Sequence, residues 1–186
     1  GEKILAEGGN AYDAATTISA MLSVVEPFAS GLGGGAFWLI YDAKSKKYTM
    51  LDARETAPLQ SHKNMYLDEN ENVIKNMSTL GPLSAGIPGI PAVLGHVNDK
   101  YGSKKLSTLL TPAYRAAING FPVNERYLKG ANYKKKWLKK YKETEAIFLH
   151  NGEVPKKGWI LKQTDLAKTI KTIMKDGHKS FYTGSF

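Results

Sequence analysis

The sequence predicts an α/β fold in which a sheet lies between layers of helix. Three observations support this: a helix of small residues near the start, a pair of apolar strands after it, and capped amphipathic helices in the second half. With 186 residues and 42% hydrophobic content, the chain is long enough for one domain, residues 1–186, with a core of its own. Its aromatic content is too high for a disordered protein.

The first predicted helix follows two glycines at residues 8–9. Asn10 is a suitable N-cap, and Asp13 can reach back to it from the first turn. Apolar residues then recur with helical spacing as far as Val25. The intervening positions are mainly Ala, Thr and Ser, so neighbouring elements can approach closely, and we expect this helix to be buried inside a layered structure.

Two short strands are predicted at Ala36–Asp42 and Lys47–Ala53, joined as a hairpin by the polar residues 43–46. Residues 37–41 (FWLIY) are apolar without alternation. A strand of this kind is typical of a sheet that is covered on both faces.

The second half of the chain predicts further helices. Pro91 can open a helix that ends near Tyr101, and another runs over residues 106–119 and is closed by Gly120. A third, amphipathic and capped, begins at residues 163–165 and ends at Gly177.

The positive charge of the chain is unevenly distributed. Residues 1–128 hold twelve basic and twelve acidic side chains, so the whole net charge of +9 lies in the last 58 residues. Residues 129–142 contain seven lysines and no acid, with Tyr133, Trp137 and Tyr141 at a spacing of four. Lysines with aromatic side chains are one way to bind nucleic acid. We favour the other interpretation, an amphipathic helix that docks its aromatic side chains and leaves its lysines in water, and predict no nucleic-acid partner.

Several classes of site and segment are not indicated. No apolar run approaches the length of a membrane span, and residues 1–5 lack the pattern of a leader, which must have been removed if the protein is exported. The absence of cysteine excludes disulfides and thiolate chemistry and leaves the cellular compartment open. The four histidines are far apart in sequence, so we expect no metal site and no cofactor.

The glycine-rich residues 31–36 (GLGGGA) match a dinucleotide fingerprint by letter only. That fingerprint follows a strand and opens a helix, whereas here a helix precedes and a strand follows. We interpret the segment as a tight turn that brings the backbone close to another part of the chain. Ser30 and Ser84 have no histidine nearby, and Thr16 and Thr17 should bond back to the preceding helical turn, so we predict no catalytic nucleophile in this chain.

Arg54, directly after the second strand, is the main candidate for binding a substrate. A guanidinium is a planar fork that holds a carboxylate with two parallel hydrogen bonds, which lysine cannot do. The flanking Asp52 and Glu55 allow a second interpretation, a strand-end ion pair. The residues alone leave these two alternatives open.

Three motifs together resemble the large subunit of gamma-glutamyltranspeptidases: residues 8–15 (GGNAYDAA), residues 25–35 (VEPFASGLGGG) and residues 51–58 (LDARETAP). Further segments agree in order, at residues 87–89, 112–113, 120–121, 155–158, 163–167 and 181–184. The resemblance covers essentially the whole chain.

The resemblance implies a four-layer αββα N-terminal nucleophile hydrolase fold, of which this chain is the large-subunit portion only. Members of the family are precursors that cut themselves, and a threonine thereby becomes the first residue of a small subunit. That threonine is the nucleophile, with its own amine as base. The chain ends within the large-subunit pattern, so it should lack the nucleophile and the oxyanion hole and be inactive alone.

The resemblance also assigns a role to Arg54, which matches the arginine that holds the α-carboxylate of the gamma-glutamyl group. Asp52 and Glu55 are then candidates for fixing the guanidinium, and the glycine turn is a packing device beside the substrate site. The implied reaction is transfer or hydrolysis of gamma-glutamyl groups. The implied partners are gamma-glutamyl compounds such as glutathione and the small subunit of the same precursor, and the implied location is periplasmic or extracellular.

Two alternatives remain. A relative of the same fold, such as a cephalosporin acylase or a poly-gamma-glutamate transferase, would bring a different carboxylate to Arg54. A protein of another class, a non-catalytic anion-binding module, would use the basic second half of the chain.

Overall fold

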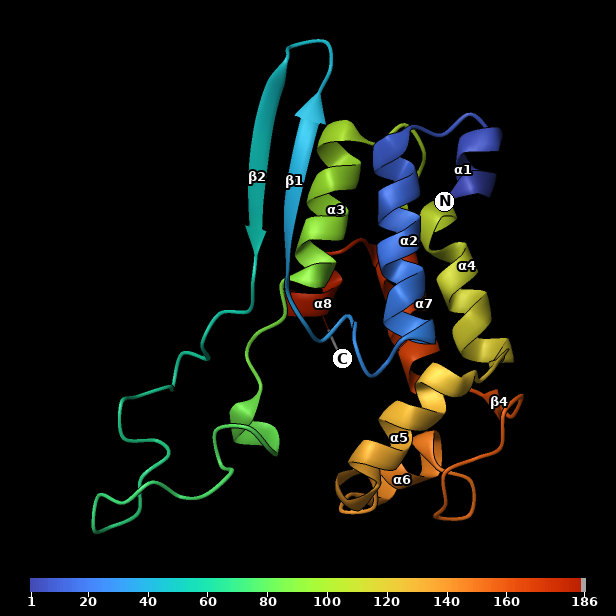
Figure 1. Ribbon diagram of the computed structural model, residues 1–186. Coiled ribbons are helices and arrows are strands. Elements are labelled where there is room, and N and C mark those ends of the chain that lie inside the picture. Colours follow the sequence, from blue (N-terminus) through green and yellow to red (C-terminus); the bar gives the residue numbers. More distant parts are fainter. Residues whose placement is uncertain (185–186) are drawn as a thin grey trace. The chain divides into compact units, whose positions relative to one another are not determined.

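Figure 1 shows the protein as a computed structural model that describes residues 1–184. The chain forms two compact units. The helical unit is Gly1–Gly31 together with the residues from Pro91 onward, and the hairpin unit is Leu32–Ile90. The single domain expected over residues 1–186 stays a prediction, because two compact units of one chain can still unfold as one.

The helical unit contains helices of very different length and two very short strands. They are α1 (Glu2–Ala6), α2 (Ala11–Val25), α3 (Ile90–Tyr101), α4 (Leu106–Asn119), β3 (Phe121–Pro122), α5 (Glu125–Leu138), α6 (Lys142–Phe148), β4 (Ile160–Leu161), α7 (Thr164–Asp176) and α8 (Ser180–Thr183). The helices predicted from Asn10, over residues 106–119 and after residue 163 are confirmed, and the one predicted from Pro91 begins one residue earlier. No helix within residues 1–184 is long and apolar enough to cross a membrane.

The start of α2 is fixed by a capping box. The Asp13 N–H donates to Asn10 Oδ1 at 2.9 Å, and the Asn10 N–H donates to Asp13 Oδ2 at 2.9 Å. The Asp13 carboxylate is fully buried and also accepts hydrogen bonds from the Ser103 hydroxyl and the Ser103 N–H. Asn10 Nδ2 donates to the Tyr101 carbonyl at 2.8 Å, so one polar cluster joins α2 to the loop between α3 and α4.

This cluster shifts the acidity of Asp13. Burial by itself would raise the pKa of the carboxyl, but hydrogen bonds from the Ser103 hydroxyl and from three backbone N–H groups together hold the pKa below its usual range. The carboxylate is therefore a structural acceptor that stays ionised at neutral pH.

The core of the helical unit lies between α2, α4 and α7, which run side by side in Figure 1. In α4 the small residues Ala113 and Ala117 are completely buried, which allows neighbouring helices to approach closely. The Gln163 side chain, at the start of α7, donates to the Val24 carbonyl at 2.8 Å at the end of α2. This pairing satisfies a backbone group that the end of α2 would otherwise leave unpaired.

A second core packs α5 and α6 over β3 and β4. Its buried members are Val123, Tyr127, Ala131 and Leu161. The Tyr127 hydroxyl donates to the Phe148 carbonyl at 2.6 Å, and burial raises the pKa of Tyr127 to about 12. The hydroxyl therefore remains a donor across the physiological pH range.

The helix expected over residues 129–142 differs from the prediction in length and in orientation. Helix α5 begins at Glu125 and ends at Leu138, and a separate helix begins at Lys142. Its buried face is formed by Tyr127 and Ala131, whereas Tyr133 is 81% exposed. The prediction of a docked aromatic face was wrong because α5 packs Tyr127 and Ala131 against Val123 and Leu161, which turns Tyr133 away from this core. The helix also begins earlier than predicted because Asn124 caps it, accepting from the Tyr127 N–H at 3.0 Å.

The hairpin unit contains β1 (Ala36–Asp42) and β2 (Lys47–Ala53), with the predicted boundaries, and a short 3₁₀ turn at Pro82–Ser84. The strands are antiparallel, with Ala36 opposite Ala53 and Asp42 opposite Lys47. This register places five large side chains on one face, where they are 50–71% exposed: Phe37, Leu39, Tyr41, Tyr48 and Met50. We call them the hairpin face.

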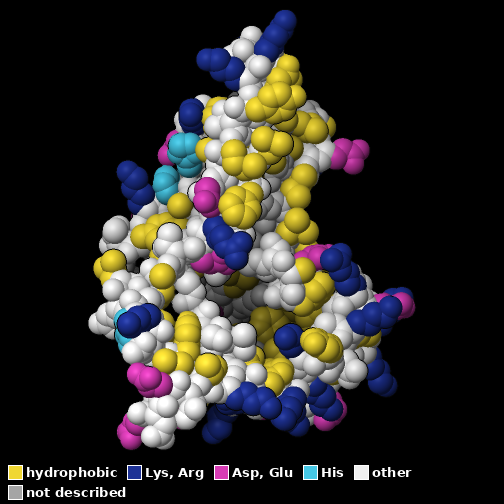
Figure 2. All heavy atoms as spheres, turned by 60° about the vertical axis from the view of Figure 1, so that its left-hand side comes forward, with side chains coloured by type: hydrophobic (Ala, Val, Ile, Leu, Met, Phe, Trp, Pro, Cys, Tyr) yellow, Lys and Arg dark blue, Asp and Glu magenta, His cyan; other side chains and the backbone are white. Residues whose placement is uncertain are grey.

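The hairpin face corrects the expectation of a sheet covered on both sides. Figure 2 shows hydrophobic side chains gathered at the top of the view, and Figure 1 shows the two strands at the top of its view. On the opposite face Ile40 is 5% exposed. The apolar run in β1 correctly indicates a strand with two apolar faces, but residues 1–184 bury only one of them.

Candidate functional site

Arg54 is the first residue after β2, and its position is fixed from both sides. Ala53 pairs with Ala36 at the end of the sheet, and the Thr56 N–H and carbonyl both pair with Ile87, at 3.1 and 2.8 Å. The chain on either side of Arg54 is therefore held by backbone hydrogen bonds, which suits a residue that must orient a ligand.

Three glycines surround the backbone at Arg54. A Cβ at Gly35 would lie 2.7 Å from Arg54 Cα, and a Cβ at Gly89 would lie 1.9 Å from the Ala53 carbonyl oxygen. A Cβ at Gly86 would lie 2.8 Å from the Cβ of Glu55. Contacts this short admit no side chain larger than hydrogen. We call Gly35, Gly86 and Gly89 the glycine collar of Arg54.

The collar is itself held together by hydrogen bonds. The N–H groups of Gly89 and Ile90 both donate to the Gly34 carbonyl, at 3.0 and 3.1 Å. The glycine-rich turn predicted to approach another part of the chain thus approaches the Arg54 segment. The contact that Gly86 and Gly89 make with the Arg54 segment was not predicted from the sequence. Two glycines in the short repeat GIPGIP, residues 86–91, are the signal that could have indicated a close backbone contact.

The Arg54 side chain is exposed, and its guanidinium forms no ion pair or hydrogen bond with any of residues 1–184. The Asp52 carboxylate instead accepts the backbone N–H of Arg54 at 2.9 Å. The strand-end ion pair with Asp52 or Glu55 is therefore not formed in this part of the chain, and Asp52 fixes the backbone of Arg54 and not its guanidinium. All the guanidinium donors are free to bind an external anion.

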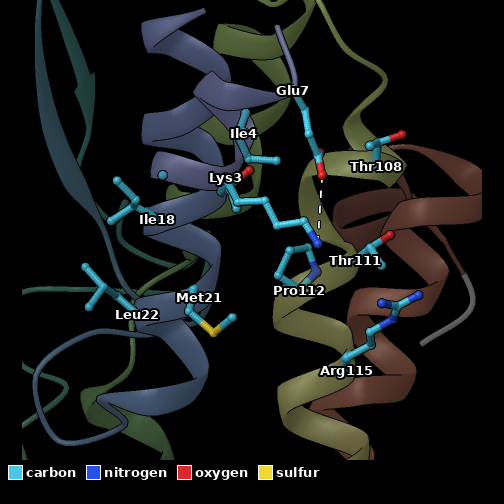
Figure 3. Close-up of a pocket in the computed structure, with 12 residues that line it drawn as sticks. Lys3, Ile4, Glu7, Ile18, Met21, Leu22, Thr108, Thr111, Pro112 and Arg115 are labelled. Carbon is cyan, nitrogen blue, oxygen red and sulfur yellow. Dashed lines mark ion pairs between the residues drawn. The ribbon is translucent and has the colours of Figure 1, made fainter. Parts of the chain in front are cut away.

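Two cavities lie in the helical unit within residues 1–184, and the larger of them is between α1, α2 and α4 (Figure 3). Its volume is about 540 Å³, and its walls are mainly apolar: Ile4, Ile18, Met21, Leu22 and Pro112. Lys3 and Glu7 form an ion pair of 3.8 Å beside it, and Arg115 lies on its other side. A smaller cavity of about 280 Å³ lies between Phe28 and the helices α5 and α6. Arg54 lines neither cavity.

The hydroxyls of Thr16 and Thr17 are buried and have no hydrogen-bond partner among residues 1–184. The expectation that they bond back to the preceding helical turn was wrong. Thr17 lines the larger cavity, which no histidine of the described chain lines. Glu7 is the carboxylate at this cavity, and it already pairs with Lys3, so no group within residues 1–184 is placed to activate the Thr17 hydroxyl. Residues 1–184 also hold no group of three or more His, Asp or Glu side chains suited to a metal ion.

Comparison with known proteins identifies the family of this chain. The sequence profile described as gamma-glutamyltranspeptidase matches residues 1–186. The glutathione hydrolase proenzyme of Bacillus subtilis strain 168 is 40% identical over 189 residues, which are 100% of this chain and 32% of that protein. The capsule biosynthesis protein CapD proenzyme of Bacillus anthracis is 38% identical, over 99% of this chain and 31% of that protein.

The structure agrees with these matches. The crystal structure of Helicobacter pylori gamma-glutamyltranspeptidase superimposes with a TM-score of 0.95 at 40% identity, over 99% of this chain and 53% of that chain. This confirms the predicted fold class, the large-subunit portion of an α/β N-terminal nucleophile hydrolase fold. The chain spans about a third of the length of the curated relatives. Since the family profile covers every residue and the sequence and structural relatives agree with it, the chain belongs to the gamma-glutamyltranspeptidase family.

Proposed function

We propose that this chain is the large-subunit part of an enzyme that transfers or hydrolyses the gamma-glutamyl groups of glutathione and related compounds. In this proposal Arg54 holds the α-carboxylate of the gamma-glutamyl donor. The observation that carries it is the state of Arg54: its backbone is fixed by the glycine collar, and its guanidinium has no anionic partner within residues 1–184.

The chemistry of Arg54 is orientation. A guanidinium stays protonated and cannot act as a general base, but its fork can hold both oxygens of a carboxylate. Fixing the α-carboxylate also fixes the gamma-carbonyl at the other end of the glutamyl chain, which lowers the entropic cost of attack on that carbonyl. The attacking group is the N-terminal threonine of the small subunit, and the acyl-enzyme that forms is passed to an acceptor amine or to water.

The small subunit of the same precursor is the proposed partner. The relatives named above are proenzymes, and this chain spans about a third of them. The hairpin face offers Phe37, Leu39 and Met50, each more than half exposed, to a second layer of structure. A two-stranded hairpin is marginal by itself and gains stability when another layer covers it. The proposed location of the enzyme is the periplasm or the extracellular space, as in the family it resembles.

A poly-gamma-glutamate transferase is the second candidate, because this chain is 38% identical to a capsule biosynthesis protein. The repeating unit of such a polymer also presents an α-carboxylate beside a gamma-amide. Arg54 would play the same part, and the two candidates differ in the length of the donor.

The test is a donor profile of the complete precursor that carries this chain. Release of aniline from a gamma-glutamyl anilide and of glutamate from glutathione, with self-cleavage visible on a gel, supports the first candidate. Preferential cleavage of poly-gamma-glutamate supports the second. A precursor that cleaves itself and acts on none of the three donors contradicts both.

A further inference from the structure

The outer face of α5 carries a line of basic side chains that the proposed reaction does not use. Lys129 and Lys136 lie seven residues apart on α5 with Tyr133 between them, and Lys140 follows in the turn after the helix. The opposite side of α5 is buried through Tyr127 and Ala131, so this line faces solvent. We call these four residues the lysine stripe.

The charge of the stripe is not neutralised by the rest of the described chain. Lys135 pairs with Glu153, and Lys157 pairs with Glu125 at 2.9 Å. Lys129, Lys136 and Lys140 are exposed and form no ion pair within residues 1–184. The stripe therefore holds three positive charges that have no anionic partner among residues 1–184 and can attract an external anion.

Tyr133 gives the stripe an amphipathic centre. Its side chain is 81% exposed, and the nearest cation is Lys134, with Nζ 5.2 Å from the ring centroid. A tyrosine that is neither buried nor hydrogen-bonded inside the protein is well suited to the boundary between water and lipid headgroups.

We propose that the lysine stripe binds the surface of an anionic lipid bilayer. Clusters of lysine on one face of a helix bind such surfaces, and each lysine adds to the affinity without a fixed geometry. The shape of the site favours a surface over a strand of nucleic acid: three of the four stripe residues lie on the outside of α5, and none of the four lines either cavity. Nucleic-acid grooves use several stacking aromatics and often arginine, whereas the stripe has one exposed tyrosine and only lysine.

Figure 2 is consistent with this assignment. Lys and Arg side chains gather along the lower edge of the molecule, in the region where Figure 1 places α5 and α6. No described helix can span a bilayer, so attachment through the stripe would be peripheral and reversible.

The test is sedimentation of the purified protein with vesicles. One set contains phosphatidylglycerol mixed with phosphatidylcholine, and the other contains phosphatidylcholine alone. The stripe variant carries Lys129→Gln, Lys136→Gln and Lys140→Gln. The matched control carries Lys168→Gln, Lys171→Gln and Lys175→Gln, which remove the same charge from exposed lysines on one side of α7. Far-UV circular dichroism checks that both variants are folded.

We expect binding to the phosphatidylglycerol vesicles only, and a loss of roughly a hundredfold in the stripe variant against a much smaller loss in the control. Raising NaCl from about 50 mM to about 300 mM should release the protein, since screening shortens the range of the lysine charges. Tyr133→Ser should weaken binding at both salt concentrations.

Three results would overturn the proposal. One is equal loss of binding in the stripe variant and the α7 control, which would show that only net charge matters. Another is the absence of binding to the anionic vesicles at low salt. The third is tighter binding to single-stranded DNA than to the vesicles at the same salt, which would make the stripe a nucleic-acid site.

Discussion

At the scale of single residues, Arg54 combines a backbone that is fixed on both sides with a side chain that has no partner within residues 1–184. Arg126, for comparison, pairs with Glu26 at 3.2 Å and lies over the Phe28 ring. An exposed guanidinium without a partner contributes little to stability. We therefore propose that Arg54 serves to bind a ligand and not to stabilise the fold.

Arg54→Lys in the complete precursor keeps the charge and removes the fork. Losing a bidentate partner in a partly desolvated site should weaken recognition of the donor by about 2–5 kcal/mol. The loss should appear as a fall in kcat/KM for gamma-glutamyl donors. Self-cleavage should continue, because it needs no substrate carboxylate. Arg126→Lys is the control and should leave kcat/KM unchanged. Normal kinetics for Arg54→Lys, or loss of folding and cleavage together, would make Arg54 a structural residue.

The glycine collar gives a second prediction at this scale. Gly89→Ala places a methyl group against the Ala53 carbonyl and should destabilise the protein by about 1–3 kcal/mol, as overpacking does. Gly33→Ala is the control, because a Cβ there meets nothing within 4 Å. Urea unfolding of the two variants measures the difference, and kcat/KM of the precursor shows whether the shift reaches Arg54. Equal stability of the two variants would show that the collar is not tightly packed.

At the scale of elements, we expect the buried start of α2 to be sensitive to acid. The folded state lowers the pKa of Asp13, so its stabilising contribution is present above the unfolded pKa, about 3.9, and is lost as the pH falls through the folded pKa. Asp13→Asn keeps one acceptor but turns an amide N–H₂ toward N–H donors. It should lower the free energy of unfolding by about 1–3 kcal/mol at neutral pH.

Urea unfolding at pH 7 and at pH 3 measures this effect. The wild type should lose stability between the two values, and Asp13→Asn should lose less of it, because its residue 13 does not titrate. Glu69→Gln, at an exposed loop position, is the control and should follow the wild type. If Asp13→Asn has the same pH dependence as the wild type, the acid sensitivity comes from other carboxylates.

At the scale of the whole molecule, local signals predicted the elements well and the contacts between them less well. The caps at Asn10 and Gly120 and the apolar strands fixed the boundaries of α2, α4, β1 and β2, because those signals act within a few residues. The exposure of Tyr133 was not predictable in this way, since the orientation of α5 depends on its packing against Val123 and Leu161. Arg54 was identified through motifs, and the role of Gly86 and Gly89 required the fold.

The hairpin face leads to the last prediction, which concerns the chain and its proposed partner, the small subunit. The chain alone should release no aniline from a gamma-glutamyl anilide, because in the proposed mechanism Arg54 only orients the donor and the nucleophile belongs to the small subunit. Co-expression with the remainder of the precursor should restore activity if the two parts meet while folding. The double variant Leu39→Ser and Met50→Ser, two cross-strand neighbours that are 67% and 60% exposed, should prevent this by removing apolar contact area.

The control for this variant is Leu59→Ser with Val73→Ser. These side chains lie in the same unit and are 106% and 75% exposed, but they are outside the two strands. The control should assemble and recover activity as the wild type does, and both variants should be as soluble as the wild type or more so, since each removes exposed apolar surface.

Activity of the uncomplemented chain would contradict the absence of a nucleophile. Full recovery by the Leu39 and Met50 variant would show that the small subunit docks elsewhere, because an interface that buries both side chains cannot lose them without weakening.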